Sequence, residues 1–291
     1  MFQGVYTALI TPFRSDGTID EPALRRIVNA QIEAGVSGLV PVGTTGESPT
    51  VSHEENLQVI EIVINEAAGR VPVIAGTGSN STAEAIDMTS RARELGAAAS
   101  LQVSPYYNKP SQEGLYRHFT TIADAVDLPM VVYNIPGRTG RNIETATLAR
   151  MAEHPRIVAV KEASGSIPQM MDVIARLPNS FDVLSGDDNL AFPLSALGGN
   201  GVVSVASNLV PARMVAMIRQ TLAGEISHAR AAHYELLPLF RAVFLDTNPI
   251  PIKYMMHRAG FCEEVYRLPI VPLADEHKAQ VDSLLSRMAI V

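Results

Sequence analysis

The chain has 291 residues, 47% of them hydrophobic and 18% charged, which is enough for one large α/β domain or two medium ones with a sizeable core. Its net charge of −7 argues against a protein that binds nucleic-acid backbones or anionic membranes. The single cysteine, Cys262, excludes an internal disulfide framework and a CxxC zinc motif, so a reducing, cytoplasmic setting is expected.

The N-terminal stretch MFQGVYTALITPF has no basic region and already has the pattern of a strand, so we expect no signal peptide. Strands are predicted, in chain order, over residues 5–10, 38–42, 71–76, 98–104, 129–134, 157–161, 181–186 and 201–206. The stretches that follow them predict helices over residues 22–35, 52–69, 82–96, 111–126, 145–154, 167–177, 189–199 and 212–224. Ser52 and Glu55 have the spacing of a capping box at the start of the second helix. No apolar run approaches the roughly 20 residues of a membrane-spanning helix.

The predicted strands are almost continuously apolar, as in parallel strands that are covered on both faces. Eight consecutive strand–helix units favour a (β/α)8 TIM barrel, although the pattern alone leaves an open doubly wound sheet possible. From residue 225 the β pattern stops, and helical patterns follow over residues 228–244 and 274–290. We therefore predict a catalytic (β/α)8 barrel over residues 1–224 and a C-terminal helical region over residues 225–291. The dipeptide Asn248-Pro249 predicts a helix N-cap followed by a proline at the first helical position.

The strand over residues 157–161 ends in a lysine. Side chains alternate along a strand, so Ile157, Ala159 and Lys161 are predicted to share one face, and Val158 and Val160 the other. If the two valines contact the outer helices, Lys161 points into the barrel mouth. Burial would lower the pKa of its amine and make it a nucleophile that attacks a ketone to form a Schiff base. A strand-end lysine that reaches solvent or pairs with a neighbouring carboxylate remains an alternative.

Other polar residues follow the ends of other predicted strands, where a barrel carries its chemistry. Tyr133 is predicted to share a face with Val131 and could relay protons during Schiff-base formation. In GTTGES (residues 43–48), glycines flank Thr44 and Thr45 and allow a turn whose N–H groups bind a carboxylate or phosphate. Arg138 is suited to a substrate carboxylate. A tyrosine with its hydroxyl in water and an exposed loop arginine remain the alternatives.

Several other kinds of chemistry are not supported by the sequence. The seven histidines are scattered and show no metal-ligand spacing, so no metal site is predicted. Asp187 and Asp188 are interpreted as a loop and helix N-cap. No GxGxxG fingerprint for a dinucleotide and no GxSxG elbow for a hydrolase occur. Cys262 is interpreted as a packed apolar residue.

Six segments together resemble those of the dihydrodipicolinate synthase family: GTTGES, SPYYNKP, YNIPGRTG, VKEASG, SGDD and TNPIPIK. The resemblance runs from the N-terminal strand to RLPIVPL near the C-terminus. GxTGE and the lysine are shared with all pyruvate-dependent class I aldolases, whereas SPYYNKP and NIPGRTG point to the synthase family. The resemblance implies a lyase that condenses pyruvate with L-aspartate 4-semialdehyde to 4-hydroxy-tetrahydrodipicolinate, in lysine and diaminopimelate biosynthesis.

The resemblance also implies the roles of catalytic residues. Lys161 would form the Schiff base and enamine with pyruvate, without a metal or an added cofactor. Tyr133, Thr44 and Tyr107 would form a proton relay, with Tyr107 reaching in from the neighbouring subunit. The family is typically a homotetramer of tight dimers, and a tyrosine supplied by a neighbour requires at least a dimer.

Substrate-binding residues follow from the same resemblance. Thr45 and the adjacent backbone would hold the pyruvate carboxylate, and Arg138 would hold the carboxylate of the semialdehyde. Gly186 and Val203 match positions that line the site, and the latter is often isoleucine.

A lysine feedback site at the tight-dimer interface is a further implication of the resemblance. Five residues fit the sensitive pattern: Ser48, His53, Asn80, Glu84 and Tyr106. Two positions depart from one well-known version, with Pro49 where alanine is common and Asn56 where a histidine can contribute. We predict inhibition by L-lysine.

Three alternatives are weighed against the synthase. A lyase of sialic or 2-keto-3-deoxy sugar acids must hold a polyhydroxylated chain, and the predicted loops supply little for this beyond Asp187, Asp188 and Ser207. A silent barrel that acts as a binding module could lose the lysine or tyrosine, but this chain keeps both. A sugar-phosphate isomerase would carry its glycine-rich phosphate loop after the last strand, whereas GGNG (residues 198–201) precedes it.

Overall fold

The computed structural model describes residues 2–290. Within this range eight parallel strands are hydrogen-bonded in the order β2-β1-β8-β7-β6-β5-β4-β3. A bridge between Leu39 and Val73 connects β2 to β3 and closes the sheet. The predicted (β/α)8 TIM barrel is confirmed. The strands are β1 (Gly4–Ala8), β2 (Gly38–Val40), β3 (Ile74–Gly76), β4 (Ala99–Val103), β5 (Met130–Asn134), β6 (Ile157–Glu162), β7 (Asp182–Ser185) and β8 (Gly201–Ser204).

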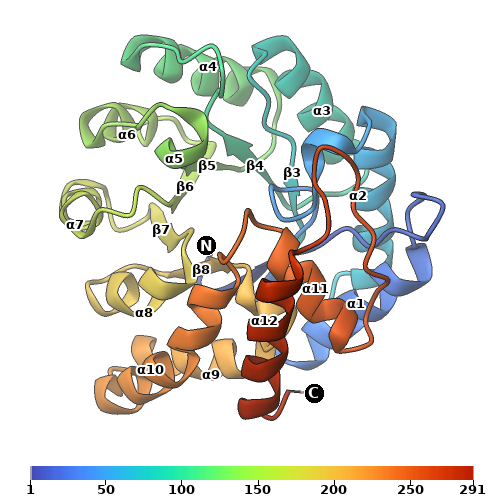
Figure 1. Cartoon of the computed structure of the whole chain (residues 1–291). Coiled ribbons are helices and arrows are strands. Elements are labelled where there is room, and N and C mark those ends of the chain that lie inside the picture. Colours follow the sequence, from blue (N-terminus) through green and yellow to red (C-terminus); the bar gives the residue numbers. More distant parts are fainter. Residues whose placement is uncertain (1, 291) are drawn as a thin grey trace.

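Helices surround the strands (Figure 1). Those that follow the strands are α1 (Glu21–Glu33), α2 (His53–Ala67), α3 (Thr82–Glu94), α4 (Gln112–Ala125), α6 (Thr145–Met151), α7 (Ile167–Arg176), α8 (Asp188–Ala196) and α9 (Pro211–Leu222). Three short helical turns lie in the loops, namely η1 (Ser48–Thr50), α5 (Pro136–Thr139) and η2 (Ala206–Asn208). The predicted capping box is confirmed, since Ser52 and Glu55 exchange hydrogen bonds at the start of α2.

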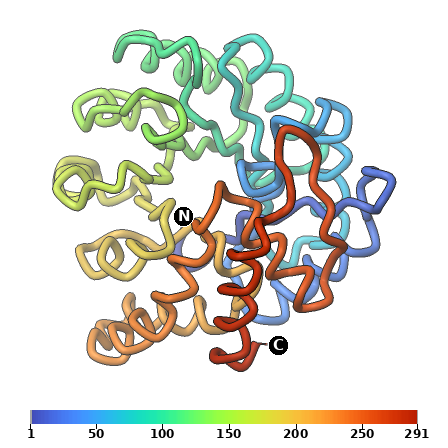
Figure 2. The backbone as a smooth tube through the Cα atoms, viewed as in Figure 1, coloured from blue at the N-terminus to red at the C-terminus, as the bar shows by residue number. Residues whose placement is uncertain are grey.

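Three C-terminal helices follow the barrel: α10 (Ile226–Ala242), α11 (Ile250–Arg258) and α12 (Asp275–Arg287). Figures 1 and 2 show the orange and red C-terminal segment beside the blue N-terminal part of the chain. The prediction for Asn248-Pro249 is wrong, because α11 begins at Ile250 and the Asn248-Pro249 peptide bond is cis. The Asn248 side chain is used elsewhere, in a contact with Thr45. None of the helices within residues 2–290 has the length and apolar character needed to cross a membrane.

Strand β6 contains a β-bulge that changes its predicted faces. The register between β5 and β6 shifts by one residue near the start of both strands, at Val158. As a result, Ile157 joins Val160 in the core between strands and helices, while Val158 packs towards the barrel interior with Ala159. The predicted faces of Ile157 and Val158 are therefore wrong. Those of Ala159 and Lys161, beyond the bulge, are confirmed.

Candidate active site

Lys161 lies at the end of β6, and its side chain is buried, with 5% of the residue exposed. Its Nζ atom lies 4.1 Å from the centroid of the Tyr133 ring. Burial lowers the pKa of Lys161 to about 8, although Asp187 and Asp188 act in the opposite direction. No ion pair to Lys161 is found within residues 2–290. The alternative of a solvated strand-end lysine is therefore wrong, and the lowered pKa leaves a larger fraction of the amine neutral, and so nucleophilic, at pH 7 than in a solvated lysine.

Gly186, just after β7, gives the lysine side chain its space. A Cβ atom at this position would lie 2.7 Å from the Cβ of Ala163 and 3.2 Å from both Cγ and Cε of Lys161. The backbone N–H of Gly186 donates to the Glu162 carbonyl at 2.8 Å, which fixes β7 against β6. Any larger residue here would clash with Ala163 and crowd the Lys161 side chain.

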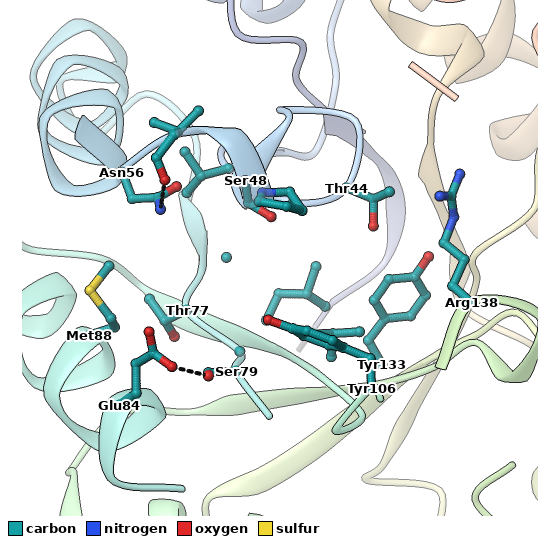
Figure 3. Close-up of a pocket in the computed structure, with 18 of the residues that line it drawn as sticks. Thr44, Ser48, Asn56, Thr77, Ser79, Glu84, Met88, Tyr106, Tyr133 and Arg138 are labelled. Atoms are coloured by element: carbon teal, nitrogen blue, oxygen red, sulfur yellow. Dashed lines mark hydrogen bonds between the residues drawn. The ribbon is translucent and has the colours of Figure 1, made fainter. Parts of the chain in front are cut away.

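Tyr133 and Arg138 lie at one end of a cavity of about 500 Å³, together with Thr44 (Figure 3). Burial raises the pKa of the Tyr133 phenol, and the Arg138 guanidinium and the Thr44 hydroxyl act in the opposite direction. The phenol is therefore protonated at neutral pH and can donate as well as accept a hydrogen bond. Arg138 belongs to α5, a single helical turn that the sequence pattern had indicated as a loop.

The turn over residues 43–48 carries free hydrogen-bond donors. Gly46 and Glu47 donate backwards within the turn, to the carbonyls of Gly43 and Thr44 at 3.0 and 3.1 Å. The N–H groups of Thr44 and Thr45, by contrast, have no hydrogen-bond partner in the part of the chain that the structure describes. Unpaired N–H groups close to one another form a suitable site for a carboxylate.

Asn248 is a site residue that sequence reasoning missed. Its side-chain amide donates to Thr45 Oγ1 at 3.0 Å, and its backbone carbonyl accepts a hydrogen bond from Arg138 Nη2 at 3.1 Å. Because Thr45 Oγ1 accepts this bond, its own O–H is left to donate to a ligand. The TNPIPIK motif was the available signal, but nothing in the sequence indicates which residues lie near it.

Ser48, His53, Glu84 and Tyr106 also line this cavity. In Figure 3, Glu84 lies at the end away from Arg138, and Tyr106 lies beside Tyr133. Glu84 pairs with His53 and accepts a hydrogen bond from Ser79. Asn80 does not line the cavity, and its side chain donates instead to the Tyr106 carbonyl at 3.1 Å. Pro49 and Asn56, the two residues that depart from the family pattern, also line the cavity, and Asn56 is buried with its Oδ1 atom unpaired.

Tyr107 and Val203 lie outside this cavity. Tyr107 follows β4, is 90% exposed and has a positive φ of 68°. Val203, on β8, is buried in the barrel interior with Tyr133 and Ala159. The structure therefore brings Lys161, Tyr133, Thr44 and Arg138 together within one chain but leaves Tyr107 on the surface.

The carboxylates near the Lys161 amine do not form a metal site. Asp188, in α8, accepts hydrogen bonds from Ser204 Oγ and from the backbone N–H groups of Val205 and Ala206. Burial raises the pKa of neighbouring Asp187 to about 6. Within residues 2–290, no group of three histidine, cysteine or acidic side chains could hold a metal ion. A buried amine beside a phenol, a guanidinium and free N–H groups is suited to Schiff-base chemistry on a small keto acid.

The chain matches the family model described as the dihydrodipicolinate synthetase family over residues 1–288. It is 50% identical to the 4-hydroxy-tetrahydrodipicolinate synthase of Pelobacter propionicus, with all of both chains covered. A chloride-inhibited dihydrodipicolinate synthase from Acinetobacter baumannii, complexed with pyruvate, is 42% identical with a TM-score of 0.99 over 100% of both chains. The enzyme from Cyanidioschyzon merolae with lysine bound is 40% identical with a TM-score of 0.97, covering 100% of this chain and 99% of that one.

Proposed function

Because the chain belongs to the dihydrodipicolinate synthetase family, we propose that Lys161 is the residue that forms a Schiff base with pyruvate. The protein is a lyase that condenses pyruvate with L-aspartate 4-semialdehyde to 4-hydroxy-tetrahydrodipicolinate in lysine and diaminopimelate biosynthesis. The reaction passes through a covalent lysine–pyruvate Schiff base and needs no added cofactor. The observation that carries the assignment is the buried Lys161 amine, whose pKa burial lowers to about 8.

The proposed reaction begins when the neutral Lys161 amine attacks the C2 carbonyl of pyruvate. The resulting carbinolamine loses its oxygen as water to give the imine, and loss of a proton from the methyl group gives the enamine. The enamine carbon then attacks the aldehyde carbon of the semialdehyde, and the new alkoxide takes up a proton. The amino group of the product attacks the imine carbon, closes the ring and releases Lys161.

The protons in these steps need a relay, which we assign to Tyr133 and Thr44. Both side chains lie at the same end of the cavity, and the Lys161 Nζ atom lies 4.1 Å from the centroid of the Tyr133 ring. Tyr107 would complete the relay from a neighbouring subunit, and its 90% exposure on a single chain supports this assignment. The same role for Tyr107 requires at least a dimer, and the family resemblance supports a homotetramer of tight dimers as the assembly.

The two substrate carboxylates would bind at different residues. The Thr45 hydroxyl and the free N–H groups of Thr44 and Thr45 would hold the pyruvate carboxylate. Arg138, which lies across the Tyr133 hydroxyl from Thr44 in Figure 3, would hold the carboxylate of the semialdehyde. Gly186 and Val203 would line the site, the first by leaving space for the lysine side chain.

The far end of the cavity is proposed as a feedback site for L-lysine. Ser48, His53, Glu84 and Tyr106 line it, and Asn80 fixes the backbone of Tyr106. The Glu84 carboxylate would bind an ammonium group. Activity measured at rising L-lysine concentrations tests this proposal, and unchanged activity up to millimolar lysine would contradict it.

A cytoplasmic location is proposed on the basis of the single reduced cysteine and the biosynthetic role. The activity itself is tested by comparing pyruvate consumption in the presence of aspartate semialdehyde with pyruvate release from sialic acid. We expect consumption only. Release from sialic acid without condensation would favour a lyase of sugar acids instead.

A further inference from the structure

The segment TNPIPIK, residues 247–253, contains the site residue Asn248 and ends in a fully buried lysine to which no step of the reaction assigns a role. Lys253 lies in α11 and has no exposed surface. Its Nζ atom lies 2.5 Å from Glu47 Oε1, whose side chain is also fully buried. The same atom lies 4.0 Å from the centroid of the Phe13 ring. Lys253 and Glu47 thus form a fully buried ion pair at the turn over residues 43–48, the proposed pyruvate site.

Glu47 is part of that turn. It has a left-handed φ of 56°, and its N–H donates to the Thr44 carbonyl at 3.1 Å. This conformation is unfavourable for a residue with a side chain, so it persists only where the surroundings hold it. Its carboxylate is held on both oxygens, since Oε2 accepts the backbone N–H of Arg267 at 3.4 Å. The backbone of the turn is therefore fixed through the Glu47 side chain.

The same C-terminal segment contacts the turn at a second point, two residues earlier in the turn. The Asn248 amide donates to Thr45 Oγ1, as described above. The segment thus contacts the turn at Thr45 and at Glu47, next to its free N–H groups, from about 200 residues away in the sequence.

An apolar pair of the same size would fill this space without the cost of removing two charges from water. In an ion pair, each charge must keep its partner. The pair therefore favours a single arrangement of the two segments that carry Glu47 and Lys253. We propose that Glu47 and Lys253 are positioning residues that hold the N–H groups of Thr44 and Thr45 in place for the pyruvate carboxylate. This inference rests on the proposed function, because it takes that turn as the pyruvate site.

The test is the double variant Glu47→Gln/Lys253→Met, which removes both charges with little change in side-chain size. Borohydride trapping of pyruvate on Lys161 is measured against pyruvate concentration, together with the melting temperature. The matched control is Glu264→Gln/Lys278→Met, which removes a 2.7 Å ion pair of the same C-terminal region that does not contact the turn. We expect the half-saturating pyruvate concentration to rise at least tenfold in the first variant and to stay unchanged in the control.

Each other outcome has a defined meaning. A folded Glu47→Gln/Lys253→Met variant with wild-type half-saturation would overturn the inference, as would a fall in the maximal trapping rate alone. If the double variant does not fold, the half-saturating pyruvate concentration is measured for the single variant Glu47→Gln, which keeps an acceptor for Lys253. The same rise is expected, and a wild-type value would overturn the inference. Failure of both variants to fold would assign the pair to stability alone and overturn the inference. Absence of any label on Lys161 in the wild-type protein would instead overturn the proposed function.

Discussion

Replacing Lys161 with methionine should stabilise the protein at neutral pH. The amine is protonated up to about pH 8 in the folded chain, because burial lowers its pKa from 10.5 to about 8. At about 1.4 kcal/mol for each factor of ten, this difference in pKa corresponds to about 3 kcal/mol of unfolding free energy lost below pH 8. Between the two pKa values the unfolded chain binds more protons, so the loss shrinks as pH rises through this window and is gone above it.

The assay is urea unfolding of wild type and Lys161→Met at pH 7 and pH 9.5. From the two pKa values, we expect the variant to gain about 3 kcal/mol at pH 7 and about 1 kcal/mol at pH 9.5. The difference of about 2 kcal/mol does not depend on how well methionine packs. The exposed Lys109 offers a control, since Lys109→Met should change stability by less than about 0.5 kcal/mol at either pH. An equal gain at both pH values would refute a buried amine with a lowered pKa.

Three further substitutions test the neighbours of the amine. Gly186→Ala should slow borohydride trapping of pyruvate by roughly tenfold or more, because the new Cβ would clash with Ala163 and crowd the Lys161 side chain; an unchanged rate would contradict the need for space at this position. Tyr133→Phe keeps the ring beside the amine but removes the proton relay, so kcat should fall roughly 100-fold or more, and a loss below threefold would argue against the relay. Arg138→Leu should raise the KM for the semialdehyde about tenfold while the KM for pyruvate changes far less, and equal changes in both would argue against separate carboxylate sites.

The barrel and its lysine could be predicted because their signals are local. Apolar strands that alternate with amphipathic helices define the repeat, and the position of Lys161 at a strand end places it at the catalytic face. Even so, the alternation that predicts the face of Lys161 does not hold along the whole of β6. The bulge at Val158 reverses the alternation at Ile157 but leaves the last residues of β6 as expected. A bulge depends on how the neighbouring strand pairs, which the sequence of one strand does not reveal.

What the sequence could not predict depends on contacts between distant segments. The need for glycine at position 186 comes from the close approach of Ala163 and Lys161, and these distances exist only in the folded barrel. Asn248 looked like a helix cap because Asn-Pro is a common local signal, yet its side chain binds Thr45, 203 residues away. The pairing of Glu47 with Lys253 was missed for the same reason.

The most direct test of the account is to incubate the protein with pyruvate, reduce it with borohydride and map the modified peptide by mass spectrometry. We predict that one reduced pyruvate is attached to Lys161, and that Lys161→Arg abolishes the label while the fold is kept, since arginine stays charged and cannot form the imine. A label on another residue, or no label on the wild-type protein, would contradict the assignment of Lys161 as the nucleophile.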